Sequence, residues 1–333
     1  MSLMQSSAVV CSDGIFPIAG DFHGKDILSL DQFSREDLAQ VIALTREMKG
    51  RAQRRELPNC LANLLVTLLF FEPSSRTIGS FDAATKRLGG QTIVVADPVK
   101  AGSTAKGESF SDTIRTFATY TDAIVIRHPL HGAASLAAEA TGIPIINAGD
   151  GINEHPTQGL LDLYTIFERF GRLDGLTGLL VGDVQNSRCI HSLLRGMALG
   201  EGNTVYLLSP PQLRLPSIEA ELLRSRGLKL IEIERAADIP RTCQFWYWTR
   251  IQRERFASQE HYHSALEQSF TLTPTLLEHY ASEDMIIMDP LPRVAESVVE
   301  EVDSDQRAVY MQSQIQNGQY VRMALLALVL GRV

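Results

Sequence analysis

The sequence predicts an α/β protein built from two doubly wound parallel-sheet domains. Short continuous apolar runs, typical of buried parallel strands, alternate with amphipathic helical segments along the chain. The alternation pauses once, at the Gly/Asp/Asn-rich stretch 147–156, and then restarts. The length of 333 residues also exceeds what one hydrophobic core usually supports. These observations together favour two domains.

The first series of elements runs from residue 64 to residue 149. LLVTLLFF is a continuous apolar run, and the helix expected after it places Phe81, Ala84 and Leu88 on one face. Ser109 and Asp112 resemble a capping box at the start of a later helix. The expected strands are 64–71, 92–96, 122–127 and 143–149, and the expected helices are 77–88, 109–120 and 132–141.

The second series begins with an amphipathic segment at 157–170, and the chain closes on a strongly apolar helix at 320–330. Between them we expect strands at 177–183, 204–209, 228–233, 244–248 and 284–289, with helices at 187–199 and 218–226. We therefore place one domain at 22–154, a second at 155–317, and an N-terminal extension at 1–21.

Composition narrows the class of protein. The net charge of −8 disfavours a nucleic-acid partner. No apolar run approaches the ~20 residues that span a bilayer, and the N-terminus lacks the pattern of a signal peptide, so we expect no membrane association. The cysteines lack zinc-finger spacing and are expected to be free thiols in a reducing cytoplasm. These are Cys11, Cys60, Cys189 and Cys243.

Polar residues gather where the expected strands end, which is where doubly wound sheets bind ligands. The first strand leads into Ser74-Ser75-Arg76-Thr77 at a helix start, so hydroxyls, backbone N–H groups and one guanidinium converge. This pattern predicts a cradle for phosphate or carboxylate. The alternative is a simple helix cap with an exposed arginine.

Further cations follow the same rule. Lys106 lies in a glycine-containing loop with Ser103, although an ordinary solvated loop explains that segment equally well. Arg127, Arg188 and Arg250 each lie near a later strand end. An acidic protein with cations at these places is expected to hold a cleft for substrates that carry several negative charges, one of them a phosphate.

No motif indicates a metal or a cofactor. H-E-x-x-H, G-x-S-x-G, the phosphate-binding G-x-x-x-x-G-K-[ST] loop and G-x-G-x-x-G are all absent from the sequence. We therefore expect neither a metal nor a cofactor.

The chain resembles the aspartate carbamoyltransferase family from about residue 22 to its C-terminus. The shared motifs are FFEPSSRT, KGES-F-SDT, IVIRHP, NAGDG---HPTQ-LLDLYTI, GD---SR--HSL, TRIQRER, PLPR and NGQYVRMALLALVL. Each alone is weak, but their common order and spacing make the resemblance specific. It implies transfer of the carbamoyl group of carbamoyl phosphate to the amine of aspartate, and a C-terminal helix at about 318–333 that returns to the first domain.

The resemblance also implies residue roles. The carbamoyl-phosphate contacts fall on Ser74, Ser75, Arg76, Thr77, Ser103, Lys106, Arg127, His155 and Gln158, and on the backbone at Pro290 and Leu291. The aspartate contacts fall on Lys106, Arg188, Arg250 and Gln252. The catalytic groups among these are Arg76, Thr77, Lys106, Arg127 and His155. Domain closure falls on Glu72, which pairs with Arg188 and Arg255.

In the family, the lysine at Lys106 enters a neighbouring subunit's site, so the resemblance implies a homotrimer with shared active sites. A regulatory chain or a dihydroorotase partner remains an open alternative, because the sequence indicates neither.

Some positions depart from the family pattern. Asp289 stands where a histidine is common before PLPR, and Arg293 is the cation expected to pair with it. The remaining departures are Ser75 and Cys189 in place of threonine, Ile78 in place of arginine, and Gly102 in place of serine. None of them removes a group that we consider indispensable.

Two other functions were weighed. A carbamoyltransferase with a cationic amine acceptor such as ornithine would not need Arg250 and Gln252. A non-catalytic structural partner of another pyrimidine enzyme would be favoured by loss of Arg76, Lys106 or His155, and all three are present.

Overall fold

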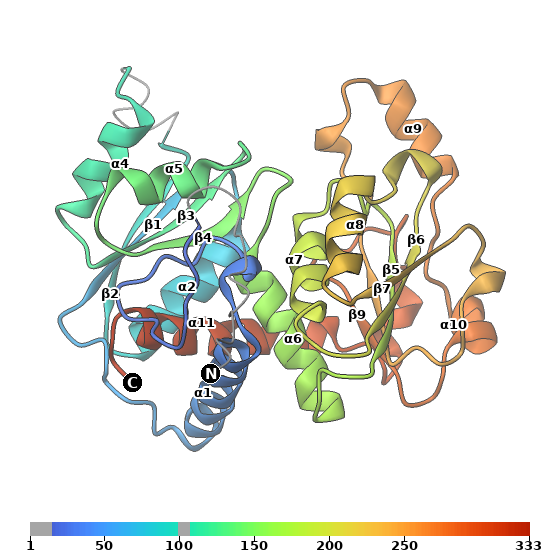
Figure 1. Cartoon of the computed structure of the whole chain (residues 1–333), viewed down its shortest axis with the longest axis horizontal. Coiled ribbons are helices and arrows are strands. Elements are labelled where there is room, and N and C mark those ends of the chain that lie inside the picture. The colour runs from blue at the N-terminus through green and yellow to red at the C-terminus, as the bar shows by residue number, and fades with distance from the viewer. Residues whose placement is uncertain (1–14, 99–106) are drawn as a thin grey trace, which may run out of the picture.

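The computed structural model describes residues 15–98 and 107–333 and has two parallel sheets side by side (Figure 1). The first sheet has the order β2-β1-β3-β4. Its strands are β1 (Leu65–Phe70), β2 (Gln91–Ala96), β3 (Ala123–His128) and β4 (Ile145–Asp150). The intervening helices are α2 (Ser75–Arg87), α4 (Phe110–Ala118) and α5 (Ala133–Ala140).

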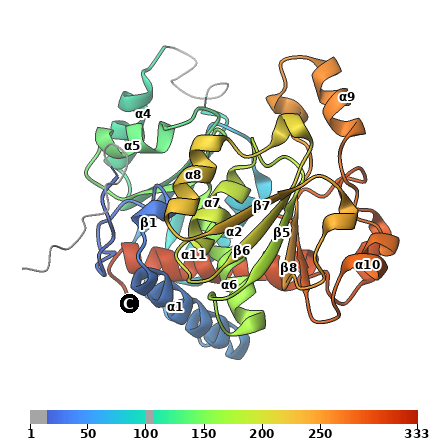
Figure 2. The same cartoon turned by 45° about the vertical axis from the view of Figure 1, so that its right-hand side comes forward.

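The second sheet has the order β7-β6-β5-β8-β9, again with parallel pairing throughout (Figure 2). Its strands are β5 (Thr177–Val181), β6 (Thr204–Leu208), β7 (Lys229–Ile233), β8 (Phe245–Trp248) and β9 (Ile286–Met288). Its helices are α7 (Arg188–Met197), α8 (Ser217–Ser225), α9 (Gln259–Glu267) and α10 (Pro274–Tyr280). The predicted α/β class with two doubly wound sheets is confirmed.

Helices α6 (Pro156–Phe170) and α11 (Ile315–Val329) pack against each other. Helix α6 packs on α7 of the second half and on β4 of the first. Helix α11 is buried almost all round and contacts α1, α2 and α6, so the expected return of the C-terminal helix to the first domain is confirmed (Figure 1). A π-helical turn, Tyr310–Gln314, leads into α11.

Helix α1 (Arg35–Arg54) was missed by the sequence analysis. Ser34 and Asp37 form its capping box, and Leu38, Val41 and Met48 lie on its buried side. It packs beneath the first sheet against α11.

Three cysteines in the described part of the chain are free thiols: Cys60, Cys189 and Cys243. Cys11 lies outside the described residues, as do Gly102, Ser103 and Lys106. Within 15–98 and 107–333, no helix has the length and apolar character needed to cross a membrane.

Candidate active site

A cavity of about 510 Å³ lies where the strands of both sheets end. Most of its walls come from the segments that follow β1, β4, β5, β8 and β9 and from the end of β3, as the strand-end rule predicts, and the rest come from the π-helical turn and α11. Among the predicted residues, the lining includes Glu72, Ser74, Ser75, Arg76, Thr77, Arg127, His155, Gln158, Arg188, Arg250, Gln252, Pro290 and Leu291. Arg255 adjoins this set through Glu72. The sequence therefore selected residues that the fold does bring together.

The start of α2 is an open anion cradle. Ser74, the N-cap residue, makes no side-chain cap hydrogen bond, and its hydroxyl instead donates to Thr77 Oγ1 at 3.0 Å. The N-cap serines of α1, α4 and α7 do accept a bond from the backbone of their helices. The first N–H groups of α2 are thus available to a ligand, together with the exposed guanidinium of Arg76. This disfavours the simple-cap alternative.

Glu72 is the meeting point of three arginines. Its Oε2 lies 2.8 Å from Arg188 Nη2 and 3.1 Å from Arg127 Nε, and its Oε1 lies 3.5 Å from Arg255 Nη2. Burial opposes ionisation of Glu72, but the charges of the three arginines outweigh it and lower the pKa of the carboxyl group. Arg188 and Arg255 also donate to the carbonyl of Gly151 at 3.0 Å each.

Arg127 and His155 share a strongly desolvated region of the cavity. Burial and the neighbouring Arg188 lower the pKa of Arg127 to about 10, so it stays charged at neutral pH. Burial, with the charges of Arg127, Arg322 and Arg188, lowers the pKa of His155 well below its usual value. His155 is therefore a neutral imidazole at pH 7, suited to donate a hydrogen bond rather than to supply a positive charge.

On the side of the cavity formed by the second sheet, Arg250 and Gln252 follow β8. Arg250 makes a two-pronged ion pair with Glu254, in which Nη1 donates to Oε2 at 3.0 Å. The backbone N–H of Gln252 donates to Asp183 at 3.3 Å, which anchors this loop to the segment after β5. An incoming carboxylate would compete with Glu254 for Arg250.

Asp289 is placed differently from the expectation. Arg293 pairs with Asp303 at 2.7 Å and makes no ion pair with Asp289 in the described structure. Asp289 Oδ1 instead accepts the N–H of Leu291 at 2.5 Å, and its Oδ2 is buried without a hydrogen-bond partner. Burial raises the pKa of Asp289 to about 7.

The sequence analysis missed Arg322, which lines the cavity from α11. Its Nη1 donates to Ser80 Oγ at 2.7 Å, and its guanidinium lies 5.0 Å from the centre of the Phe81 ring. Burial lowers the pKa of Arg322 to about 10. A signal was available, since a single arginine inside the apolar run 320–330 is costly to bury without a function.

Among His, Cys, Asp and Glu in the described residues, no group of three or more gathers in a way that could hold a metal ion. The cavity's chemistry is that of cationic groups and directed N–H donors.

Residues 25–168 match the family model for the aspartate/ornithine carbamoyltransferase, carbamoyl-P binding domain, and residues 174–329 match that for the Asp/Orn binding domain. The chain is 43% identical over 311 residues to an aspartate carbamoyltransferase catalytic subunit of Thermococcus kodakarensis, covering 93% of this chain and 98% of that one. It is 44% identical to part of the multifunctional protein URA2 of Saccharomyces cerevisiae, where the match spans 14% of the longer chain.

Solved structures agree. Aspartate transcarbamoylase from Trypanosoma cruzi, in complex with carbamoyl phosphate and aspartate, superposes with a TM-score of 0.87 at 38% identity, covering 95% of this chain and 99% of that one. The catalytic subunit of M. jannaschii aspartate transcarbamoylase gives a TM-score of 0.82 at 41% identity, with 91% and 96% coverage.

Proposed function

The chain belongs to the aspartate/ornithine carbamoyltransferase family, and we propose that the cavity described above is where it transfers the carbamoyl group of carbamoyl phosphate to L-aspartate. The products are N-carbamoyl-L-aspartate and phosphate, and the reaction is a step of de novo pyrimidine synthesis. The observation that carries the assignment is the convergence of five arginines, Arg76, Arg127, Arg188, Arg250 and Arg322, with an uncapped helix start on one cavity.

Carbamoyl phosphate binds at the start of α2. Its phosphate meets the N–H groups and hydroxyls of Ser74, Ser75 and Thr77, and the guanidinium of Arg76. Its carbamoyl group lies among Arg127, His155, Gln158 and the backbone carbonyls of Pro290 and Leu291. Ser103 and Lys106, which lie outside the described residues, complete this end of the site in the same proposal.

Aspartate binds on the second-domain side of the cavity. Arg188 and Arg250 have the positive charge that two carboxylates require, and Gln252 adds a polar contact. Glu72 holds Arg188 and Arg255 from across the cavity and so stabilises the closed arrangement.

In the reaction, the neutral amine of aspartate attacks the carbonyl carbon of carbamoyl phosphate. A C–N bond forms, the C–O bond to phosphate breaks, and the amine proton leaves with the phosphate. Arg76, Thr77, Arg127 and neutral His155 donate hydrogen bonds to the oxygen on which negative charge develops. Much of the remaining acceleration comes from holding two mutually repelling anions in contact.

The acceptor is tested by incubating the purified protein with carbamoyl phosphate and either L-aspartate or L-ornithine. Phosphate release and carbamoyl-aspartate formation are expected with aspartate alone. Turnover with ornithine and not aspartate would reassign the acceptor, and turnover with neither would favour a non-catalytic partner of another pyrimidine enzyme.

The assembly is proposed to be a homotrimer in which Lys106 completes a neighbour's site. Arg76→Ala and Lys106→Ala trimers are each expected to be inactive, and activity should reappear when they are dissociated, mixed and reassembled. No recovery after reassembly, verified by native mass spectrometry, would contradict a shared site. A partner protein, for which a dihydroorotase or a regulatory chain is the candidate, is a further proposal, and the match to one part of the multifunctional protein URA2 is consistent with it. The free thiols favour the cytoplasm.

A further inference from the structure

A chain of buried hydrogen bonds lies against the cavity and joins two segments that line it. Gln158 Nε2 donates to Asp162 Oδ1 at 3.0 Å, and Gln314 Nε2 donates to the same oxygen at 2.7 Å. The backbone N–H of Asp289 donates to Gln314 Oε1 at 3.1 Å, and Leu291 N–H donates to Asp289 Oδ1 at 2.5 Å. These five residues form one hydrogen-bonded network.

The three residues at the middle of this hydrogen-bonded network are buried. Asp162, Gln314 and Asp289 are 0%, 2% and 3% exposed. Tyr247 OH donates to the second oxygen of Asp162 at 2.7 Å, so this carboxylate accepts three hydrogen bonds from α6, β8 and the π-helical turn. Gln314 is thus the link between α6 and the segment after β9.

The donor and acceptor pattern fixes how both glutamine amides face. Burial raises the pKa of Asp162 to about 7, and above that pH the ionised carboxylate only accepts hydrogen bonds. Gln158 and Gln314 then each turn their NH2 group toward Asp162, as in the structure. Gln314 then presents Oε1 to Asp289, and Gln158 keeps Oε1 as the polar atom available to a ligand in the cavity it lines. An uncoupled amide would be free to turn its NH2 group there instead.

The backbone of the segment after β9 adopts an unfavourable conformation that other groups must stabilise. Leu291 has a backbone φ of 59°, a left-handed conformation that is rare for a bulky residue. Such conformations persist where the surroundings impose them, often at functional sites. The bond from Leu291 N–H to Asp289 supplies that constraint, and Gln314 in turn holds the backbone of Asp289.

We propose that Gln314 is a positioning residue, which fixes the amide of Gln158 through Asp162 and the backbone at Pro290 and Leu291 through Asp289. This inference rests on the proposed function. Gln314 sets the distance between Gln158 Oε1 and the backbone carbonyls of Pro290 and Leu291, which accept hydrogen bonds from the N–H groups of the carbamoyl group. The π-helical turn that ends at Gln314 fits this role, because such turns are frequent at functional sites. Small misplacement of a reacting group costs large factors in rate.

The first test compares Gln314→Met with a matched control, Asn317→Leu. Asn317 lies in the same part of the chain and is 0% exposed. It bonds Thr165 and Glu168 at 3.1 Å each and Lys49 at 2.9 Å, away from the cavity lining. Both variants replace a buried amide by an apolar side chain of similar size, so both should lower the melting temperature.

Only Gln314→Met should change the kinetics strongly. We expect kcat/KM for carbamoyl phosphate to fall at least 30-fold in Gln314→Met and at most threefold in Asn317→Leu. A folded Gln314→Met enzyme within threefold of wild type would overturn the proposal, as would an equal loss in the two variants. An inactive wild-type enzyme would instead refute the proposed function, so the two failures are distinguishable.

Gln314→Glu gives a second test if Gln314→Met does not fold. Glutamate keeps the acceptor for Asp289 N–H but meets Asp162 as a second carboxyl group, and the two can share a proton at low pH. The titratable or charged groups around this pair are Cys189, Tyr247, Asp289 and Arg322. The ratio of Gln314→Glu to wild-type kcat/KM should rise at least fivefold from pH 8.5 to pH 6, and a flat ratio would overturn the proposal.

Discussion

Replacing Glu72 by glutamine removes the charge on which three arginines meet while keeping the side chain's shape. The closest contacts are a charge-assisted hydrogen bond from Arg188 at 2.8 Å and an ion pair with Arg127 at 3.1 Å. Such a bond contributes about 1.5–3 kcal/mol, and the neutral amide retains about 1 kcal/mol from one contact. Counting a similar contribution from each of the two contacts, the closed arrangement should lose about 2–5 kcal/mol, equivalent to a roughly 30- to 5000-fold fall in kcat/KM for aspartate.

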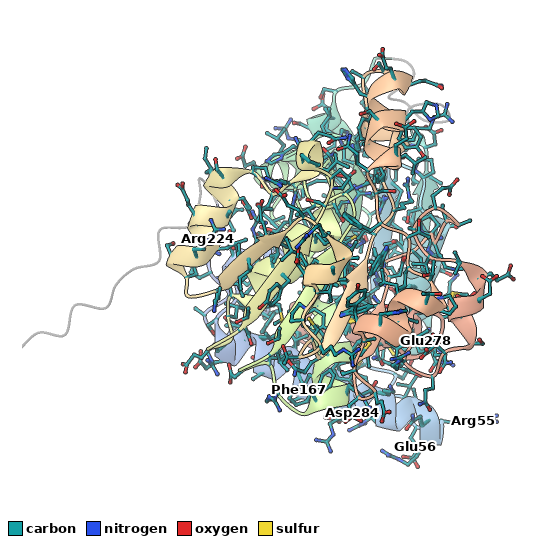
Figure 3. All side chains as sticks on the ribbon, turned by 90° about the vertical axis from the view of Figure 1, so that its right-hand side faces the viewer. Arg55, Glu56, Phe167, Arg224, Glu278 and Asp284 are labelled. Atoms are coloured by element: carbon teal, nitrogen blue, oxygen red, sulfur yellow. The ribbon has the colours of Figure 1, made fainter. Side chains whose placement is uncertain are left out.

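The assay is initial-rate phosphate release at saturating carbamoyl phosphate with aspartate varied. The control is Glu56→Gln, because Glu56 pairs with Arg54 at 2.8 Å but is 63% exposed on the surface (Figure 3). Exposed pairs contribute about 0–1 kcal/mol, so this variant should match wild type. A Glu72→Gln enzyme with kcat/KM within threefold of wild type would refute a role in closure. If only its melting temperature fell, the cluster would be purely structural.

The remaining predictions concern the anion cradle and the buried carboxyl group after β9. Arg76→Lys keeps the charge but loses the planar fork, so kcat/KM for carbamoyl phosphate should fall about 10²- to 10³-fold without a change in melting temperature, measured by kinetics and calorimetry. Burial raises the pKa of Asp289 from 3.8 to about 7, so its contribution to stability is fully present below pH 3.8 and is lost as pH rises through about 7. Asp289→Asn should thus gain about 3 kcal/mol of stability relative to wild type between pH 5 and pH 8.5; equal differences in urea unfolding at both pH values would contradict the assigned burial cost.

Most of the fold was predictable because buried parallel strands leave a strong local signal. The run at β1 and those at β3 and β5 are continuous and apolar, and the structure places strands there. Helix α1 was missed although Leu38, Val41 and Met48 recur at helical spacing on its buried side, because the eight charged residues among its twenty mask this apolar stripe. Its capping box at Ser34 was the signal that could have found it.

The site was predictable to the extent that strand ends converge, but its internal pairing was not. Arg293 is near Asp289 in sequence, yet it pairs with Asp303, because the choice depends on how the loop after β9 folds back. Gln314 and Asp162 are 152 residues apart, and although Asp162 lies in the HPTQ-LLDLYTI motif, no sequence pattern links it to Gln314. Which buried amide meets which carboxyl group is decided by packing, which periodicity does not encode.

The pairing of the cavity's charges bears on the order in which substrates bind. Glu72 pairs with Arg188 and Arg127, and Glu254 pairs with Arg250, whereas Arg76 has no ion pair within the described residues. A phosphate can therefore bind at the α2 start without breaking an existing pair. A carboxylate at Arg250 must first displace Glu254. This cost favours aspartate binding second, when contacts with the bound carbamoyl phosphate can offset it.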